Sequence, residues 1–367
     1  MTGTLPLLII GSGIAGAAAA IDLARAGQRP LIIERNREIG DAICGGFLSW
    51  QSLAALERLG LSPQLLGGQP VNEVRLFAGR RMARAPLPQR GMGLSRRALD
   101  TALLDQALAA GASVERGISV RTYGPDAVML SDGATLKPAD LFVAHGKYGV
   151  AGHQRHPPAK VAADPVVGLR LRLSATRQIA MLVGEAVELF LFDRGYAGLV
   201  RQEDGTANLC LAVHKSRLSE AGGKPEVLIA QWGASNGPLG ERLAAADPVG
   251  PIDAIAAIPY GWRRSSGPDG LWHLGDQAAV IPSLAGEGMG IALSTASSAV
   301  ASWRQGDRSA DWQRRMARRL APPMTLARII WALAEHPRWN GAGVALLQQL
   351  PMLTGVLARG TRVPGNA

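Results

Sequence analysis

Three glycines near the N-terminus have the spacing of a loop that holds phosphate groups. Gly11, Gly13 and Gly16 directly follow a short apolar run that ends at Ile10. The first glycine permits a tight turn, the second lets the backbone approach a pyrophosphate, and the third lets the following helix pack closely on the strand. The N–H groups in the first turn of that helix would then point at the phosphates. The spacing therefore predicts a pyrophosphate site.

An acidic residue lies where the adenosine end of a dinucleotide would need one. The expected strand Pro30–Ile33 ends directly before Glu34. A carboxylate at this place accepts hydrogen bonds from ribose hydroxyls. Strand, glycine triplet, Ala-rich helix, second strand and acid follow in the order of a dinucleotide fold. The alternative is a glycine-rich turn in an unrelated α/β protein, and the ordered set favours the dinucleotide.

A second set of glycines, near the other end of the chain, indicates that the dinucleotide is FAD. The expected strand Leu271–Leu274 leads into Gly275 and Asp276, whose carboxylate can accept a hydrogen bond from a ribityl chain. Ten residues further on, a helix opens with Gly286-Glu287-Gly288-Met289-Gly290. These glycines let the backbone lie against a flat ring, and the N-terminal helix dipole would stabilise negative charge on a reduced flavin.

Length and composition indicate a globular enzyme with more than one domain. The chain has 367 residues, 47% of them hydrophobic, and a mean hydropathy of +0.09. This length exceeds the usual size of a single core. Its two cysteines are too far apart in sequence to suggest metal-ligand spacing or a disulfide framework, so we expect no metal and a reducing cytoplasm. The stretch from Thr4 to Ile21 lacks the basic start of a signal peptide, and no long apolar run follows it.

The net charge of +10 comes almost entirely from arginine, and part of it gathers in one segment. We expect residues 303–320 to form a strongly basic helix. A solvated helical face is the favoured interpretation. The alternative is a docking site for an anionic phospholipid surface, a coenzyme A thioester or an acyl carrier protein, with the protein peripheral to a membrane. No nucleic-acid partner is expected, because the basic residues are not interleaved with aromatics.

Several motifs together resemble a superfamily of FAD proteins that includes the geranylgeranyl reductases and the aromatic-ring hydroxylases. They are the Gly11 triplet, Cys44-Gly45-Gly46, Ser95-Arg96-Arg97-Ala98-Leu99-Asp100, Gly275-Asp276 and Gly286-Glu287-Gly288-Met289. The resemblance implies that Arg96 lies against FAD, that Glu34 holds the adenosine ribose, and that Asp276 holds the ribityl and pyrophosphate region. It also implies that Gly288 and Met289 lie near the flavin ring. Further expected FAD contacts are Ala15, Arg35, Cys44, Gly46 and Val120.

The expected fold is α/β, with a glutathione-reductase-like Rossmann domain for FAD, an inserted antiparallel sheet that holds the substrate, and C-terminal helices. We assign residues 1–70, 95–158 and 265–320 to the FAD domain, 71–94 and 159–264 to the substrate domain, and 321–367 to the helical segment. The local pattern predicts a helix over Phe47–Leu59 and strands over Val166–Leu173 and Ala180–Phe192. Apolar helices after Met324 either pack as a terminal subdomain or line a lipophilic tunnel.

Two departures from the family motifs bear on the chemistry. Hydroxylases of the superfamily carry Asp-Gly where this chain has His145-Gly146, and reductases carry a Tyr-x-Trp-x-Phe-Pro strand where this chain keeps only Tyr196. We therefore expect NADPH or NADH, if it is the donor, to visit transiently and to reduce the flavin slowly. Tyr196, Cys44 and His145 are the candidate catalytic residues. For each, a packing role or a local hydrogen bond is the competing interpretation.

The sequence leaves three functions open. The favoured one is a monooxygenase acting on an aromatic, polyketide-like or other lipophilic small molecule. The second is a reductase of isoprenoid double bonds. The third is a cyclase-like enzyme or an interaction protein in which FAD undergoes no net redox change. Oligomeric state is left undetermined.

Overall fold

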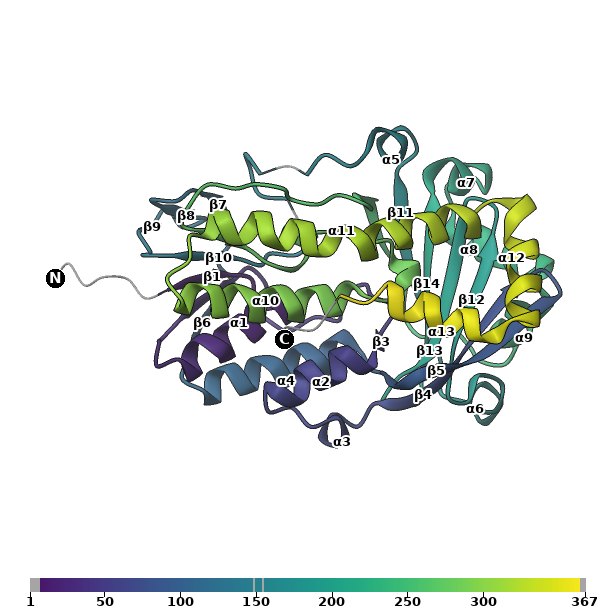
Figure 1. Ribbon diagram of the computed structural model, residues 1–367. Helices are drawn as coiled ribbons and strands as arrows, with labels where there is room; N and C mark the ends of the chain where they lie inside the picture. Colours follow the sequence, from purple (N-terminus) through teal and green to yellow (C-terminus); the bar gives the residue numbers. More distant parts are fainter. Residues whose placement is uncertain (1–6, 148, 154, 364–367) are drawn as a thin grey trace.

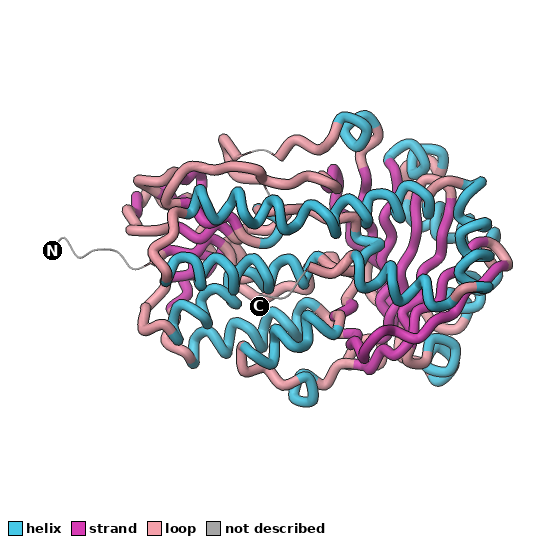
Figure 2. Tube along the Cα trace, in the orientation of Figure 1, coloured by secondary structure: helices cyan, strands magenta, loops and turns pink. Residues whose placement is uncertain are grey.

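The two largest sheets of the protein lie at opposite ends of an elongated molecule, with helices between them (Figures 1 and 2). The computed structural model describes residues 7–147, 149–153 and 155–363. The long helix α11 (Ser309–Ala334) runs from one sheet to the other (Figure 1). This arrangement places a space between the sheets that residues from both can reach.

The smaller sheet has five strands, all parallel. Its order is β16 (Leu271–His273), β10 (Leu141–Val143), β1 (Leu8–Ile10), β2 (Leu31–Glu34) and β6 (Ser113–Arg116). The strands at its centre are continuous apolar runs, as parallel strands covered on both faces require. The expected α/β fold with a Rossmann-like parallel sheet is confirmed.

Different layers cover the two faces of this sheet. Ile9 packs towards the helices, whereas Leu8 and Ile10 belong to the cluster on the opposite face. The helical layer consists of α1 (Ile14–Arg25), α4 (Arg96–Ala109) and α10 (Gly288–Arg304), and the other layer is the antiparallel sheet of β7 (Val120–Tyr123), β8 (Val128–Leu130) and β9 (Thr135–Leu136). Four alanines of α1, at positions 17 to 20, are fully buried, so this helix lies close to its neighbours.

The larger sheet has eight strands drawn from distant parts of the chain. Its order is β15 (Asp253–Ile258), β11 (Val166–Leu173), β14 (Ala207–His214), β13 (Gly195–Arg201), β12 (Ala186–Phe192), β4 (Gln69–Ala78), β5 (Arg81–Gly93) and β3 (Phe47–Leu48). All neighbouring pairs are antiparallel except β4 and β12, which run parallel. The sheet thus contains strands from both segments expected to form the substrate domain, residues 71–94 and 159–264. The domain boundaries assigned from the sequence stay a prediction.

Three local expectations were wrong. Phe47 and Leu48 are not helical, because they pair with β5, and α2 (Trp50–Arg58) begins only after the cap Ser49. The run expected as one strand over 180–192 contains the end of α6 (Arg177–Val183), which stops at Gly184 with φ of +58°. The basic segment 303–320 is two helices, since α10 ends at Arg304 and α11 begins at Ser309.

The remaining helices lie on the surface of the two sheets or at the C-terminal end. They are α3 (Pro63–Leu66), α5 (Ala159–Ala163), α7 (Lys215–Glu220), α8 (Pro225–Ser235), α9 (Gly237–Ala244), α12 (Pro337–Gln349) and α13 (Pro351–Gly360), with short 3-10 helices η1 (Gly275–Gln277) and η2 (Ser283–Ala285). Within the described ranges, no single helix is long and apolar enough to cross a membrane. Helices α12 and α13 pass that test only as a pair, bent by 111°.

Candidate functional site

A cavity of about 1280 Å³ lies between the two sheets and reaches the C-terminal helices. Its volume exceeds the roughly 300 to 1,000 Å³ of most small-molecule pockets. Of the expected site residues in the described chain, Gly16 alone does not line it. Those that do are Gly11, Gly13, Ala15, Glu34, Arg35, Cys44, Gly46, Arg96, Val120, His145, Tyr196, Gly275, Asp276, Gly286, Gly288 and Met289.

The glycine loop leaves room for a phosphate at one position only. Added Cβ atoms would lie 2.6 Å from the carbonyl oxygen of Ala144 at Gly11 and 1.9 Å from that of Gly11 at Gly16. At Gly13 the nearest described atom would be Arg96 Nη2, at 3.5 Å. No described side chain caps α1, so the N–H groups of its first turn face the opening. Gly11 and Gly16 therefore shape the fold, and Gly13 borders a space that fits a pyrophosphate.

The carboxylate of Glu34 is held in a fixed position at the far end of the cavity. Its Oε2 accepts hydrogen bonds from the N–H and the hydroxyl of Ser12, both at 2.9 Å, and its Oε1 accepts one from the N–H of Asn36 at 2.9 Å. The side chain is buried. A carboxylate fixed in this way can still accept from ribose hydroxyls, because each oxygen has more than one acceptor position. The sequence analysis missed Ser12, the middle residue of the glycine triplet.

Arg96 places a positive charge beside the glycine loop. Its Nε and Nη2 donate to the two carboxylate oxygens of Asp100 at 3.0 and 2.7 Å, one helical turn further along α4. Burial alone would lower the pKa of Arg96, but Asp100, with smaller effects of Cys44 and Asp276, raises it above its usual value. Arg96 is therefore charged at any physiological pH and can neutralise a phosphate.

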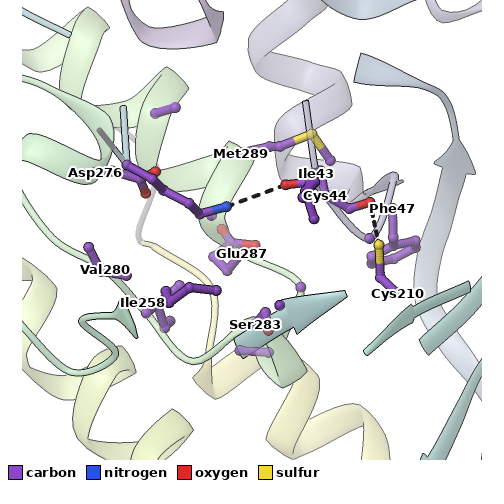
Figure 3. Close-up of a pocket in the computed structure, with 18 of the residues that line it drawn as sticks. Ile43, Cys44, Phe47, Cys210, Ile258, Asp276, Val280, Ser283, Glu287 and Met289 are labelled. Atoms are coloured by element: carbon purple, nitrogen blue, oxygen red, sulfur yellow. Dashed lines mark hydrogen bonds between the residues drawn. The ribbon is translucent and has the colours of Figure 1, made fainter. Parts of the chain in front are cut away.

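The second glycine loop lies across the cavity from the Cys44 loop, and Figure 3 shows Asp276, Glu287 and Cys44 around the same opening. Gly286 has φ of +62°, and a Cβ there would meet the ring of Phe47 at 3.2 Å. Such a loop fits the edge of a flat ring system. Glu287 is buried at the wall of the cavity, where its carboxylate pairs with Arg362. Neither residue was among the expected site residues.

Side chains of the large sheet hold the Cys44 loop in place. The carbonyl oxygen of Cys44 accepts hydrogen bonds from Asn208 Nδ2 and Cys210 Sγ, both at 2.9 Å. Arg170 donates to the carbonyl oxygens of Asp41 and Ala42 at 2.7 and 3.1 Å. Burial raises the pKa of Cys210 to about 12, so this thiol stays protonated. The loop that faces the flavin region is thus positioned by the substrate-side sheet.

His145 belongs to a small polar cluster at the edge of the cavity. Its Nε2 lies 3.4 Å from the hydroxyl of Tyr123, and its Nδ1 lies 3.3 Å from Nε2 of Gln277. These neighbours are consistent with the local hydrogen-bonding role that competed with catalysis for this residue.

Two buried tyrosine hydroxyls and the hydroxyl of exposed Ser283 form a chain in the apolar part of the cavity. Ser283 Oγ lies 2.6 Å from the hydroxyl of Tyr260 and also hydrogen-bonds the hydroxyl of Tyr196. All three residues line the cavity. Burial raises the pKa of Tyr196 well above its usual value and raises that of Tyr260 as well. The chain can therefore hold protons and pass them along. Ser283 and Tyr260 were missed because they lie in irregular segments without a motif.

Beyond this chain the cavity is apolar and extends to the C-terminal helices. Residues of α11, α12 and α13 line this part, among them Ile330, Val344, Leu347 and Leu357. The sequence allowed these helices either to pack as a terminal subdomain or to line a lipophilic tunnel. In the structure they form part of the wall of an apolar cavity. The cavity thus has a polar end at Glu34 and an apolar end at α11 to α13.

Comparison with known proteins identifies the cofactor. Residues 4–131 match the family model of the FAD binding domain. A menaquinone reductase of Mycolicibacterium smegmatis is 26% identical to the chain over 391 residues, which cover 98% of this chain and 91% of that protein. Squalene epoxidase erg1 of Schizosaccharomyces pombe is 33% identical over 89 residues, covering 24% of this chain and 20% of that protein.

The fold has close structural relatives among flavoproteins. The flavin-dependent brominase Bmp2 superposes with a TM-score of 0.77 at 16% identity, covering 99% of this chain and 95% of that one. The family match covers the segment that contains the glycine loop, Glu34 and Arg96, where the geometry fits a dinucleotide. Residues 4–131 therefore match an FAD binding domain, and the chain is an FAD-dependent oxidoreductase.

Proposed function

We propose that the protein reduces a carbon–carbon double bond in the isoprenoid chain of a lipid such as a prenylated quinone. The observation that carries this proposal is the chain of hydroxyls Tyr196–Ser283–Tyr260 inside an otherwise apolar cavity. The whole-length similarity to a menaquinone reductase supports a lipid of this class. The cavity's volume would accommodate a long apolar chain together with the cofactor.

Alkene reduction needs a hydride on one carbon and a proton on the other. Reduced FAD supplies a hydride when it is bound. Tyr196 would supply the proton, because burial keeps its hydroxyl protonated well above pH 10. Ser283 and Tyr260 would then return a proton to Tyr196 along the hydroxyl chain. The apolar walls would exclude water, so that the proton reaches the double bond from Tyr196 and not from solvent.

The test is anaerobic turnover of a menaquinone with enzyme reduced by dithionite. The proposal expects a product two hydrogens heavier, with both on the side chain, and this product does not revert when air is admitted. Reduction of the quinone ring instead would give a quinol that air reoxidises. That outcome would overturn the assignment of the double bond as the reacting group.

Monooxygenation of a lipophilic substrate is the second candidate. It is favoured by the local similarity to a squalene epoxidase. Oxygen uptake that depends on substrate, with incorporation of labelled oxygen into the product, would establish it and exclude the reductase. Turnover with no electron uptake would exclude both and leave the third hypothesis, in which FAD has no net redox role.

A further inference from the structure

We propose that α12 and α13, with the end of α11, dock on the surface of an anionic phospholipid bilayer and admit the substrate from it. The proposal goes beyond the reaction, because it concerns how a lipophilic molecule reaches the cavity. It rests on exposed apolar side chains, their continuity with the cavity, and the charge around them.

The C-terminal helices expose several large apolar side chains within a short stretch of the chain, here called the apolar rim. Helix α13 carries Met352, which is 85% exposed, and Val356, which is 56% exposed. Trp339 of α12 and Leu350 between the helices are 56% and 51% exposed. Isolated exposed apolar residues are normal on protein surfaces, but a contiguous patch marks an interaction site.

The apolar rim is also the mouth of the cavity. Six large apolar residues of these helices are exposed to solvent and also line the cavity: Ile329, Leu333, Trp339, Leu346, Leu353 and Val356. A side chain with one face in the cavity and another in solvent lies at an opening. A lipid that leaves a bilayer here would pass from one apolar surface to another without entering water. A second copy of the chain on the same surface would close this opening, which is why we favour the bilayer.

Charge around the apolar rim is positive. Residues 336–367 contain no aspartate or glutamate, and they include the exposed Arg338 and Arg359. The tip of the β4–β5 hairpin adds exposed Arg80 and Arg81, and Arg81 donates to the carbonyl oxygen of Gly341 in α12 at 3.0 Å. Arginines that flank an apolar surface favour anionic headgroups.

This surface differs from the basic segment that the sequence had suggested as a docking site. There, Arg314 pairs with Asp311 and Arg315 with Asp307. Paired charges of this kind suit a solvated helical face, and a partner for that segment stays a prediction.

The geometry of the helix pair indicates that it lies along the bilayer. Helices α12 and α13 have 13 and 10 residues, and they are bent by 111°. A helix needs about 20 apolar residues to span a bilayer. An amphipathic helix shorter than this can bury its apolar face at the level of the headgroups.

Flotation of the FAD-loaded protein with vesicles of phosphatidylglycerol and phosphatidylcholine tests the proposal. Met352→Glu should raise the lipid concentration for half-maximal binding by about tenfold, because it removes an apolar anchor and adds a repelled charge. The matched control is Leu65→Glu on α3, where the leucine is 87% exposed but lies far from the apolar rim in sequence and lines no part of the cavity. This control should bind vesicles as the wild type does.

Two further results decide between the possible occupants of the surface. Arg338→Gln with Arg359→Gln should weaken binding to anionic vesicles and flatten its salt dependence. Equal binding by Met352→Glu and wild type would overturn the proposal. So would a wild-type dimer that Met352→Glu dissociates while neither protein binds vesicles, since the partner would then be a second copy. Vesicle binding is independent of turnover, so failure here would leave the proposed reaction standing.

Discussion

The carboxylate of Glu287 and the guanidinium of Arg362 form a buried ion pair that joins the chain after α13 to the glycine loop of the flavin site. Arg362 Nη1 also donates to the carbonyl oxygens of Ala285 and Gly286 at 3.0 and 3.2 Å, and the N–H of Val363 donates to Glu287 at 3.2 Å. The loop that would lie against the flavin is therefore held by the segment that follows the substrate-side helices.

Arg362→Gln should destabilise the protein and weaken FAD binding, because it leaves a buried carboxylate without its cation. Loss of one partner of a buried pair costs about 3 to 5 kcal/mol. The double variant with Glu287→Gln should recover part of that loss, since two neutral side chains remain. Thermal unfolding and FAD titration measure both effects, with exposed Arg359→Gln as the control. A double variant no more stable than Arg362→Gln would contradict the account.

The stability deficit of Arg362→Gln should grow with pH. Burial raises the pKa of Glu287 above its usual 4.5, and Arg362 opposes that rise. Without Arg362 the pKa in the folded state is higher still, so the folded state binds the proton more tightly than the unfolded state does. Stability then falls as pH rises from about 4.5 through the folded-state pKa. Denaturant unfolding from pH 4 upwards would show a deficit that is smallest in acid.

Substitutions of two glycines in the same loop should separate folding from cofactor binding. Gly13→Val should fold but lose FAD, because its Cβ would meet only the Arg96 side chain at 3.5 Å while the added bulk fills the phosphate space. Gly16→Val should fail to fold, because its Cβ would lie 1.9 Å from the carbonyl oxygen of Gly11. Circular dichroism and the flavin absorbance of the purified proteins distinguish the two. A Gly13→Val protein that retains FAD would show that the pyrophosphate lies elsewhere.

Glu34→Ala should raise the dissociation constant of FAD while the fold persists. It removes a charged acceptor for the ribose and frees the N–H of Ser12 that the carboxylate now binds at 2.9 Å. Hydrogen bonds to a charged group contribute about 1.5 to 3 kcal/mol, or roughly 10- to 150-fold in affinity. Fluorescence titration of the apoprotein measures the change, with exposed Glu57→Ala on α2 as a control.

Tyr196→Phe should slow double-bond reduction by roughly a hundredfold or more without changing FAD affinity, because it removes the proposed proton donor. The matched control is Tyr123→Phe, since Tyr123 is also buried but lines no part of the described cavity. Single-turnover reoxidation of reduced enzyme by substrate, without oxygen, gives the rate. Equal rates for both variants and the wild type would remove Tyr196 from the reaction.

The cofactor half of the site could be predicted from sequence, because phosphate and ribose recognition depend on local spacing. Gly13 and Glu34 lie within one strand–helix–strand unit, so their order in the chain fixes their order in space. The pairing of Glu287 with Arg362 depends on tertiary packing and leaves no trace in either segment. Similarly, the apolar residues at the end of α6 continue into β12, so the pattern from Ala180 onwards predicts one strand although the chain turns at Gly184.

The parallel pairing of β4 with β12 determines whether the two sheets can be separated by cutting the chain. Arg75 and Glu188, which bridge these strands, are separated by 113 positions, and the strands β6 and β10 of the cofactor sheet lie between them in sequence. No single cut of the chain can therefore detach the substrate sheet from the cofactor sheet. Nicking of the surface loops by a protease should leave fragments that stay associated and yellow until denaturant is added. An exchange of substrate preference with a relative would require transplanting several segments at once.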